Sequence, residues 1–337
     1  MHDALVEWCA ETLGYRPPAR IERIGTGHSR AMLRLQFDDG RRAVVRMEQG
    51  GVFGTSGAEE ARVMAALRAR GAPVAAIVAD EPTGTVTGRP FFVMEDLAER
   101  AGTALDGSDE RRVDDETAAS FVATLHGLHT LGTDHDFGFD LVPDRPDDAT
   151  PAQVERWRAT YRAATGEPIP LLEEAAAWLT RNAPPLERLS VVHGDAGPGN
   201  FVRVDRGAGR PEVVLTDFEF CHLGDPAEDW SFCLTMRGAR TMPSERWLAL
   251  FAEHAGVDLE PERWRYWEAF NLFKGACANR TCLALFENGR NPTPNMAIIG
   301  TALHQVFLRR LVDIVGSRPS PPSRVPEGDR HQGRSHA

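Results

Sequence analysis

Lysine is almost absent from this chain. Lys274 is its one lysine, and arginine supplies nearly all of the positive charge. A P-loop of the form GxxxxGKS or GxxxxGKT needs a lysine directly after its glycines, and the chain has no such stretch. A P-loop nucleotide site is therefore excluded, and the scarcity of lysine limits which side chains could bind a phosphate group.

Cysteine is scarce as well, and long apolar runs are absent. The odd number of cysteines and the lack of a CxxC pair predict reduced, mostly buried thiols rather than disulfides or a zinc site. No apolar run approaches the roughly 18 residues of a membrane span, and no charged leader precedes an apolar stretch. We therefore expect a cytoplasmic protein with no membrane partner. The five cysteines are Cys9, Cys221, Cys233, Cys277 and Cys282.

Positive charge is in deficit overall. The formal net charge is −11 at pH 7, which argues against a nucleic acid or an anionic membrane as partner. A cationic substrate stays compatible with this charge. With 337 residues, 42% of them hydrophobic, the chain is long enough to bury a sizeable core and to form two lobes or domains.

The N-terminal part of the chain has the pattern of a small antiparallel sheet. Apolar and polar residues alternate in Ala31–Phe37, and Asp38-Asp39-Gly40 is a hairpin signal before the next strand. Ser56 followed by Glu59 forms a capping box, which predicts a helix running to about Arg70. We expect strands at Ala19–Ile24, Ala31–Phe37, Ala43–Met47, Ala75–Ala79 and Pro90–Glu95, and a first helix at Asp3–Leu13.

Beyond Leu97 the pattern becomes mainly helical. The sequence thus predicts an α+β protein with a β-rich lobe over residues 1–97 and an α-rich lobe over 98–316. The tail over 317–337, rich in Pro, Arg, Gly and His, is expected to be disordered. A monomer or a homodimer is expected. The predicted helices are Asp115–Leu131, Pro151–Thr165, Pro170–Asn182, Pro243–Ala255, Glu262–Glu287 and Asn295–Val315, interrupted only by a hairpin of Phe201–Val204 and Glu212–Thr216.

Three polar residues stand together in the stretches VVHGDAGPGNFVRV and EVVLTDFEF. Asp195 and Asn200 are close enough for one short loop to hold both, and the strand before Asp217 delivers a second carboxylate. This set supplies one base and two hard oxygen ligands, which suits a magnesium-bound nucleotide beside an acceptor hydroxyl. Taken singly, each residue is an ordinary turn former, especially around the glycines and proline of the loop. The joint pattern predicts phosphoryl transfer.

The stretches HGDAGPGN and LTDFEFCHLGDPAEDW resemble the catalytic core of the aminoglycoside phosphotransferase / choline kinase family of small-molecule kinases. The resemblance covers about residues 20–315 and is closest to a broad bacterial group related to phosphotransferase domains fused to acyl-CoA dehydrogenases. It implies a two-lobed protein-kinase-like fold with ATP and Mg²⁺ in the cleft between the lobes. It also implies that Asp195 is the catalytic aspartate, that Asn200 and Asp217 ligate magnesium, and that His193 and Asp229 brace the loop.

The resemblance also implies a nucleotide site in the N-terminal lobe. Gly25, Gly27 and Ser29 lie between two predicted strands, where backbone N–H groups and a hydroxyl could cover phosphates. An ordinary glycine-rich turn is the alternative interpretation of this segment. Glu95 and Leu97 fall in the expected hinge between the lobes, where backbone groups would meet the adenine.

Arg46 occupies the position at which kinases place a lysine against the α- and β-phosphates. Arginine is a permanent cation that can bind phosphate through two N–H groups. Glu60 matches the family glutamate that pairs with this cation, with Glu59 as the alternative if the register differs by one. The replacement of lysine keeps a second hypothesis open, a nucleotide-binding pseudokinase with a regulatory or scaffold role.

Two questions stay open at the level of sequence. His126 and His129 lie on one face of a predicted helix, where they could bind a metal or pack beneath the catalytic loop. The acceptor is a small-molecule hydroxyl whose identity no motif gives: an antibiotic, an amine, a sugar or a hydroxyacyl thioester. Glu268, Asn271 and Glu287 are the residues that we expect near it.

Overall fold

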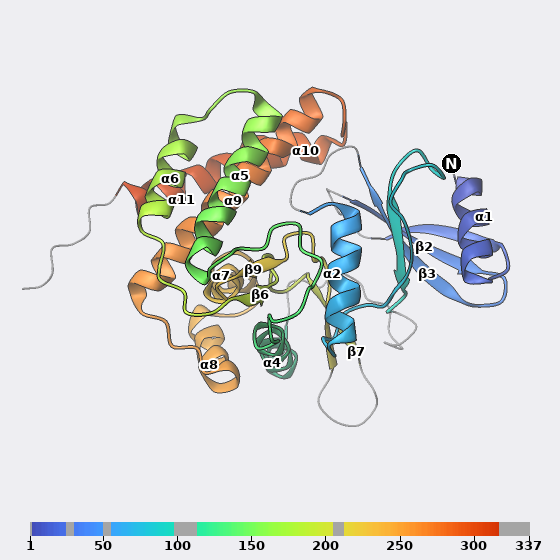
Figure 1. The fold of residues 1–337 in the computed structure, drawn as a ribbon, viewed down its shortest axis with the longest axis horizontal. Coiled ribbons are helices and arrows are strands. Elements are labelled where there is room, and N and C mark those ends of the chain that lie inside the picture. Colours follow the sequence, from blue (N-terminus) through green and yellow to red (C-terminus); the bar gives the residue numbers. More distant parts are fainter. Residues whose placement is uncertain (1, 25–29, 50–54, 98–112, 205–211, 317–337) are drawn as a thin grey trace, which may run out of the picture.

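The computed structural model describes residues 2–24, 30–49, 55–97, 113–204 and 212–316. It has two lobes, a five-stranded antiparallel sheet flanked by helices and a mainly helical lobe (Figure 1). This confirms the predicted two-lobed α+β fold. The boundary predicted after residue 97 stays a prediction, because residues 98–112 lie outside the described part, as does the tail over 317–337.

The N-terminal sheet has a helix on each face (Figure 1). Alternation along β2 turns Leu33, Leu35 and Phe37 toward α1, where they pack with Leu5 and Cys9. The strand order is β1-β2-β3-β5-β4. The strands are β1 (Pro18–Ile24), β2 (Arg30–Phe37), β3 (Arg42–Glu48), β4 (Ile77–Glu81) and β5 (Phe91–Glu95), with α1 (His2–Leu13) and α2 (Gly57–Ala69) as the helices.

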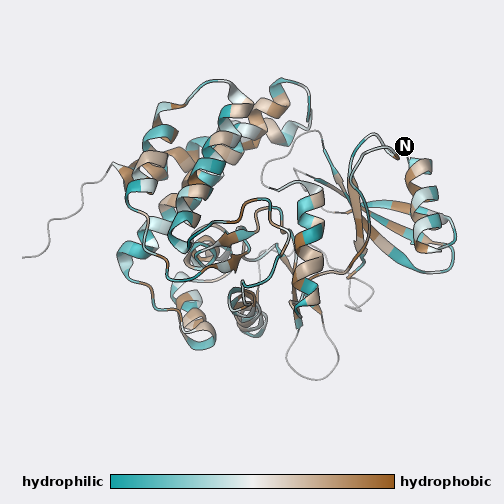
Figure 2. Ribbon diagram, in the orientation of Figure 1, coloured by the Kyte–Doolittle hydropathy of each residue, from teal (hydrophilic) through white to brown (hydrophobic). Residues whose placement is uncertain are grey.

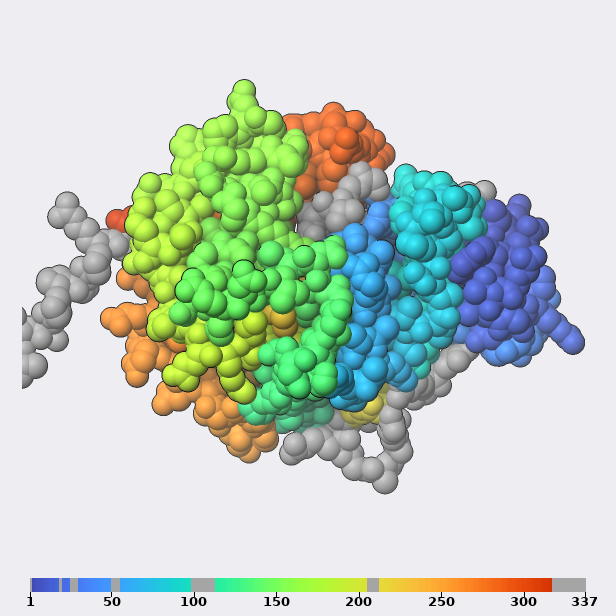
Figure 3. Space-filling model, in the orientation of Figure 1, coloured from blue at the N-terminus to red at the C-terminus, as the bar shows by residue number. Residues whose placement is uncertain are grey.

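α2 begins as its capping residue predicts, but only half of the capping box forms. The Ser56 hydroxyl accepts a hydrogen bond from the Glu59 N–H at 3.1 Å. The Glu59 carboxylate instead accepts from the Asp140 N–H of the other lobe at 3.0 Å. Glu59 therefore contacts the C-terminal lobe and Glu60, one residue further, lies fully buried on the face toward the site. Figure 3 shows the two lobes in broad contact on this side.

The C-terminal lobe is built on a long buried helix, α9. Most of its residues from Tyr266 to Leu285 are buried, and α5, α7 and α11 pack around it. The surrounding helices have one apolar face and one polar face (Figure 2). The helices are α4 (Asp115–His129), α5 (Ala149–Thr165), α6 (Pro170–Arg181), α7 (Ala227–Phe232), α8 (Ser244–Ala255), α9 (Pro261–Glu287), α10 (Pro294–Ile298) and α11 (His304–Val315), with π-helical turns at Cys233–Arg237 and Ile299–Leu303.

The expectation of a single hairpin in this lobe is wrong. The predicted hairpin exists as β7 (Phe201–Val204) and β8 (Glu212–Leu215), but a second antiparallel pair joins β6 (Ser190–Val192) to β9 (His222–Gly224). Strands of three residues are too short to show a period in the sequence. This second pair matters because β6 leads directly into the catalytic loop predicted from the motif.

Asp229 of α7 joins three parts of this lobe. Its side chain is completely buried and accepts hydrogen bonds from the backbone N–H groups of His193 and Gly194 at 2.7 and 2.8 Å. His129 of α4 contacts the same carboxylate at 2.8 Å. Burial alone would raise the pKa of Asp229, but the hydrogen bond and charge of His129 and the backbone donors outweigh it and lower the pKa below its usual value. Of the two histidine interpretations, packing beneath the loop is the one the structure supports.

Two further sequence expectations can be compared with the fold. All five cysteines are buried and free. None of the helices in the described ranges is long and apolar enough to cross a membrane.

Two helical glycines should respond oppositely to alanine. A Cβ at Gly300 would lie 2.3 Å from the Leu283 Cβ of α9 and 2.7 Å from its backbone, so Gly300→Ala should lower the free energy of unfolding by about 1–3 kcal/mol. Gly127 lies in α4 with nothing within 4 Å of a Cβ, and Gly127→Ala should raise it by roughly 0.5–1 kcal/mol. Urea unfolding measures both; an unchanged Gly300→Ala would show that α9 and the Ile299–Leu303 turn can move apart.

Asp229→Asn should lower the free energy of unfolding at neutral pH by about 3 kcal/mol, because an amide cannot accept through both atoms from buried donors. The folded-state pKa of Asp229 lies below its unfolded value, so its contribution is complete above the unfolded pKa and is lost as pH falls through the folded pKa. In urea titrations, the free energy of unfolding should therefore decrease less in the variant than in the wild type as pH falls below about 4. The exposed Asp134→Asn is the control and should follow the wild-type curve.

Candidate active site

The loop after β6 places Asp195 and Asn200 together. Gly194 has φ of 80°, and a Cβ there would lie 2.3 Å from the Phe220 carbonyl oxygen, so only glycine fits. The Asn200 Nδ2 donates to the Asp195 carbonyl at 2.9 Å and to its Oδ2 at 2.7 Å. Both bonds use the nitrogen, which leaves the Asn200 Oδ1 as the atom that could ligate a metal.

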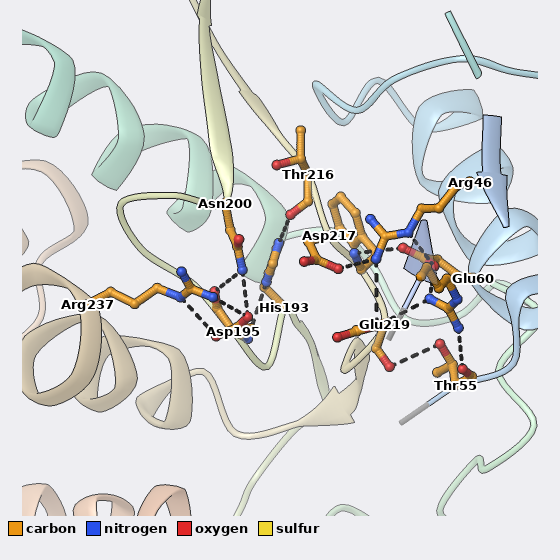
Figure 4. A network of polar contacts seen from close by, with 12 residues as sticks. Arg46, Thr55, Glu60, His193, Asp195, Asn200, Thr216, Asp217, Glu219 and Arg237 are labelled. Carbon is orange, nitrogen blue, oxygen red and sulfur yellow. Dashed lines mark hydrogen bonds and ion pairs between the residues drawn. The ribbon is translucent and has the colours of Figure 1, made fainter. Parts of the chain in front are cut away.

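Arg237 is the loop's second partner, and sequence reasoning missed it. Its Nε and Nη2 donate to Asp195 Oδ1 and Oδ2 at 2.9 and 2.5 Å (Figure 4). Its Nη1 reaches the Pro198 carbonyl at 3.3 Å. This fork orients the carboxylate and balances its charge. Arg237 ends the π-helical turn Cys233–Arg237, and no periodic signal distinguishes it from the many other arginines.

Asp217 follows β8 in a backbone conformation that only it adopts among the described non-glycine residues. Its φ is 68°, in the left-handed region. Such a conformation costs about 1–3 kcal/mol and is retained where the surrounding structure imposes it. The neighbouring Thr216 carbonyl lies 2.9 Å from His193 Nε2, which ties this strand end to the catalytic loop. His193 thus braces the loop, in agreement with the resemblance.

Arg46 of β3 points across the lobe boundary at these residues (Figure 4). It is 6% exposed and forms an ion pair with Asp217, with Glu60 at 3.4 Å and with Glu219 at 3.7 Å. The atom nearest Glu60 is the buried Nε, which makes an ion pair there but no hydrogen bond among the described residues. The predicted phosphate cation therefore lies beside the predicted magnesium ligand.

Arg30 of β2, also missed, is the closer partner of Glu60. One guanidinium nitrogen pairs with the Glu60 carboxylate and lies 3.5 Å from Glu219, and the other donates to the Thr55 carbonyl at 2.5 Å. The pairing predicted between Glu60 and Arg46 is thus present but longer, and Arg30 makes the tighter contact. The other Glu60 oxygen accepts from the Phe218 N–H at 3.1 Å, so this residue spans both lobes.

Glu219 adds a third carboxylate that the motif did not single out. Burial, together with the charge of Asp217, raises the pKa of Glu219 to about 8. Burial acts on Asp217 in the same direction, but the adjacent Arg46 outweighs it and lowers the pKa of Asp217 below its usual value. Within this coupled pair the proton is therefore favoured on Glu219 and the negative charge on Asp217.

The remaining predicted nucleotide contacts have mixed outcomes. Gly25, Gly27 and Ser29 lie outside the described residues, so their predicted role stays a prediction. The Glu95 N–H donates to the Ala76 carbonyl at 2.9 Å, which leaves it unavailable to an adenine. Leu97 is buried in the core cluster that joins the lobes.

Two of the three acceptor residues expected on α9 are engaged in contacts within the protein. Asn271 is fully buried and donates to the Glu228 carbonyl at 3.1 Å, so it cannot line an acceptor pocket. Glu268 is bound to Arg310 of α11 at 2.6 Å. Glu287 lies with Arg280 beside a hollow of about 260 Å³ at the ends of α5 and α9.

The donor set suits a cation that is held partly by a substrate. Within the described ranges, no three His, Cys, Asp or Glu side chains gather into a closed metal site. Mg²⁺ usually takes one or two protein oxygens and completes its shell with phosphates and water. The Asn200 amide oxygen and the carboxylate of Asp217 fit this requirement, with Glu219 two residues further along.

Comparisons with known proteins find relatives in sequence and in fold. Acyl-CoA dehydrogenase family member 10 of Mus musculus is 28% identical over 295 residues, 75% of this chain and 26% of that protein, so the chain spans about a quarter of its length. LicA in complex with AMP has a TM-score of 0.62 at 15% identity, covering 93% of this chain and 97% of that one. A choline/ethanolamine kinase family protein from Mesorhizobium loti has a TM-score of 0.52 at 16% identity, covering 94% and 98%.

At these identities the solved structures establish the kinase-like fold alone. The sequence model of the phosphotransferase enzyme family, APH, matches residues 20–267. That range contains every residue of the network around Asp195, Asp217 and Arg46. The chain belongs to the APH phosphotransferase family, whose relatives in fold include small-molecule kinases.

Proposed function

We propose that this protein is an ATP- and Mg²⁺-dependent phosphotransferase that moves the γ-phosphate to a hydroxyl of a small molecule. The observation that carries the proposal is the convergence of Asp195, Asn200 and Asp217 opposite a buried guanidinium from the other lobe (Figure 4). Phosphoryl transfer needs positioning and charge neutralisation more than covalent chemistry, and this set provides both.

Asp195 is the proposed catalytic residue. Arg237 and Asn200 occupy three of its acceptor positions, and Oδ1, which takes a single hydrogen bond, keeps a lone pair for an acceptor hydroxyl. Asp195 would orient that hydroxyl and take its proton as the oxygen bonds to the γ-phosphorus and the bond from phosphorus to ADP breaks.

Asn200 and Asp217 would hold the magnesium ion, which when bound neutralises charge on the phosphates. Arg46 contacts Asp217 in this structure, so nucleotide binding would require it to turn part of its fork toward phosphate oxygens. Arg30 keeps Glu60 in place while Arg46 moves. Arg46 would thus bind phosphate while Arg30 holds Glu60, and the two arginines would share the role that one lysine has in other kinases.

The acceptor is proposed to be a small molecule, with no nucleic-acid or membrane partner and with the protein acting as a monomer or homodimer in the cytoplasm. The net charge of −11 supports the absence of a nucleic-acid or anionic-membrane partner. Relatives named as choline/ethanolamine kinase and acyl-CoA dehydrogenase point to different acceptors, an amine and a hydroxyacyl thioester. An acceptor panel should therefore contain both classes besides aminoglycosides and sugars.

One observation favours the alternative of a nucleotide-binding pseudokinase. Arg46 occupies the carboxylate that would ligate the metal, through a contact that a catalytic cycle must break. If nucleotide stabilises the protein equally with and without Mg²⁺, and no acceptor yields ADP, the pseudokinase describes it better.

Asp195→Asn should reduce phosphate transfer by about 10²–10⁴-fold while Mg²⁺–nucleotide affinity stays unchanged, because the amide cannot take the hydroxyl proton. Transfer is followed by mass spectrometry on the acceptor panel, and ATP hydrolysis without acceptor serves as a second readout. Asp115→Asn removes an exposed carboxylate paired with Arg246 and should keep full activity. Full transfer by Asp195→Asn would overturn the catalytic assignment.

Asp217→Asn and Arg46→Met should separate metal from phosphate binding. Asp217→Asn should abolish the Mg²⁺-dependent part of the thermal stabilisation by nucleotide, and Arg46→Met should weaken binding about tenfold or more in the presence of metal. Arg62→Gln removes an exposed arginine paired with Asp140 and is the matched control. Unchanged stabilisation in both site variants would place the nucleotide elsewhere.

A further inference from the structure

The one lysine of the chain lies buried directly beneath the catalytic loop. Lys274 is 2% exposed and comes from the middle of α9. Its Nζ lies 2.6 Å from the Gly194 carbonyl oxygen and 2.6 Å from Glu228 Oε1. The ring of Phe232 lies 4.7 Å from the same nitrogen. A buried ammonium needs such partners, since its desolvation is otherwise uncompensated.

The contact with Gly194 acts on the peptide group that carries Asp195. The carbonyl end of this group accepts from Lys274, and its N–H end donates to His193 Nδ1 at 3.3 Å. A peptide group is planar and rigid, so two bonds at opposite ends hold the orientation of its plane and with it the N–Cα bond of Asp195, about which the side chain is placed. The preceding N–H groups, of His193 and Gly194, are held by Asp229.

Charge compensation alone does not explain this placement. Each acidic residue in the segment from Asp225 to Asp229 has its own cationic or donor partners: Arg263 for Asp225, His129 for Asp229, and Lys274 with His222 for Glu228. Arg263, also on α9, pairs with the carboxylate of Asp225. Lys274 divides its donors between a carboxylate and the loop backbone.

We propose that Lys274 is a positioning residue for Asp195: it holds the Gly194–Asp195 peptide group and so fixes the direction of the Asp195 carboxylate from beneath. The catalytic part of this proposal rests on the proposed role of Asp195, whereas the positioning part concerns the loop itself. α9 is thereby connected to the catalytic loop through one side chain.

A double variant separates positioning from folding. Lys274→Met alone leaves Glu228 buried without its cation and should lower the unfolding midpoint strongly. Combining it with Glu228→Gln removes the stranded charge, and the double variant should regain most of the lost midpoint. Lys274→Arg, which keeps a donor for both partners, is the conservative variant, and Glu228→Gln alone is the reference for the double variant.

The readouts are hydrogen exchange of the peptide spanning residues 193–200 and the kinetics of transfer or of ATP hydrolysis. The refolded double variant should exchange faster in this peptide than Glu228→Gln does, and its kcat should fall about tenfold or more with KM for Mg²⁺–ATP nearly unchanged. Lys274→Arg should recover much of both. Tyr266 lies elsewhere on α9, and its hydroxyl donates a buried hydrogen bond to the Leu179 carbonyl of α6. Tyr266→Phe removes this bond and should lower the unfolding midpoint without changing either readout.

Two outcomes would contradict the proposal. If the double variant matches Glu228→Gln in exchange and in kcat, Lys274 serves only to neutralise Glu228. If wild-type protein shows no turnover with any acceptor, the proposed function fails instead, and the exchange of residues 193–200 still decides whether Lys274 fixes the loop.

Discussion

A buried cluster of ion pairs joins the two lobes, and the geometry of the site depends on this cluster. Arg30 and Arg46 enter from the sheet and meet Glu60, Asp217 and Glu219. Two guanidinium groups would be costly to bury beside a single carboxylate, and three ionised carboxylates would repel one another. Burial and the charge of Asp217 raise the pKa of Glu219 to about 8, which favours its protonated form and lessens this repulsion. The ion pairs of the cluster therefore hold the lobes in register.

The same cluster explains why arginine can take the place of lysine on β3. An ammonium group is compact and could not contact Asp217, Glu60 and Glu219 at once, whereas the guanidinium of Arg46 reaches all three. Arg46 is therefore a cation already shared among three carboxylates. If nucleotide binds as proposed, it must redistribute these ion pairs.

The sequence predicted those features that are local in the chain. The Ser56 cap, the alternating β2 strand and the spacing of Asp195 and Asn200 depend on neighbouring residues, and each lies where expected. The missed residues, among them Arg30, Arg237 and Glu219, act on partners far away in the sequence. Because arginine carries nearly all of the positive charge in this chain, nothing in the local sequence distinguishes the arginines that contact a carboxylate in the site. The strands β6 and β9 were not predicted for a different reason, because a strand of three residues is too short to show a hydrophobic period.

The scarcity of lysine acquires a structural meaning from this arrangement. The proposed phosphate contact belongs to an arginine, while the single lysine lies where its ammonium group meets a backbone carbonyl, a carboxylate and an aromatic ring. There it supports the loop at its backbone, complementing Arg237, which holds the Asp195 carboxylate itself. The direction of Asp195 is thus set twice, once at its backbone from α9 and once at its oxygens from the turn after α7. A catalytic carboxylate fixed at both ends can orient a hydroxyl without reorganising, which is the condition under which positioning lowers a barrier.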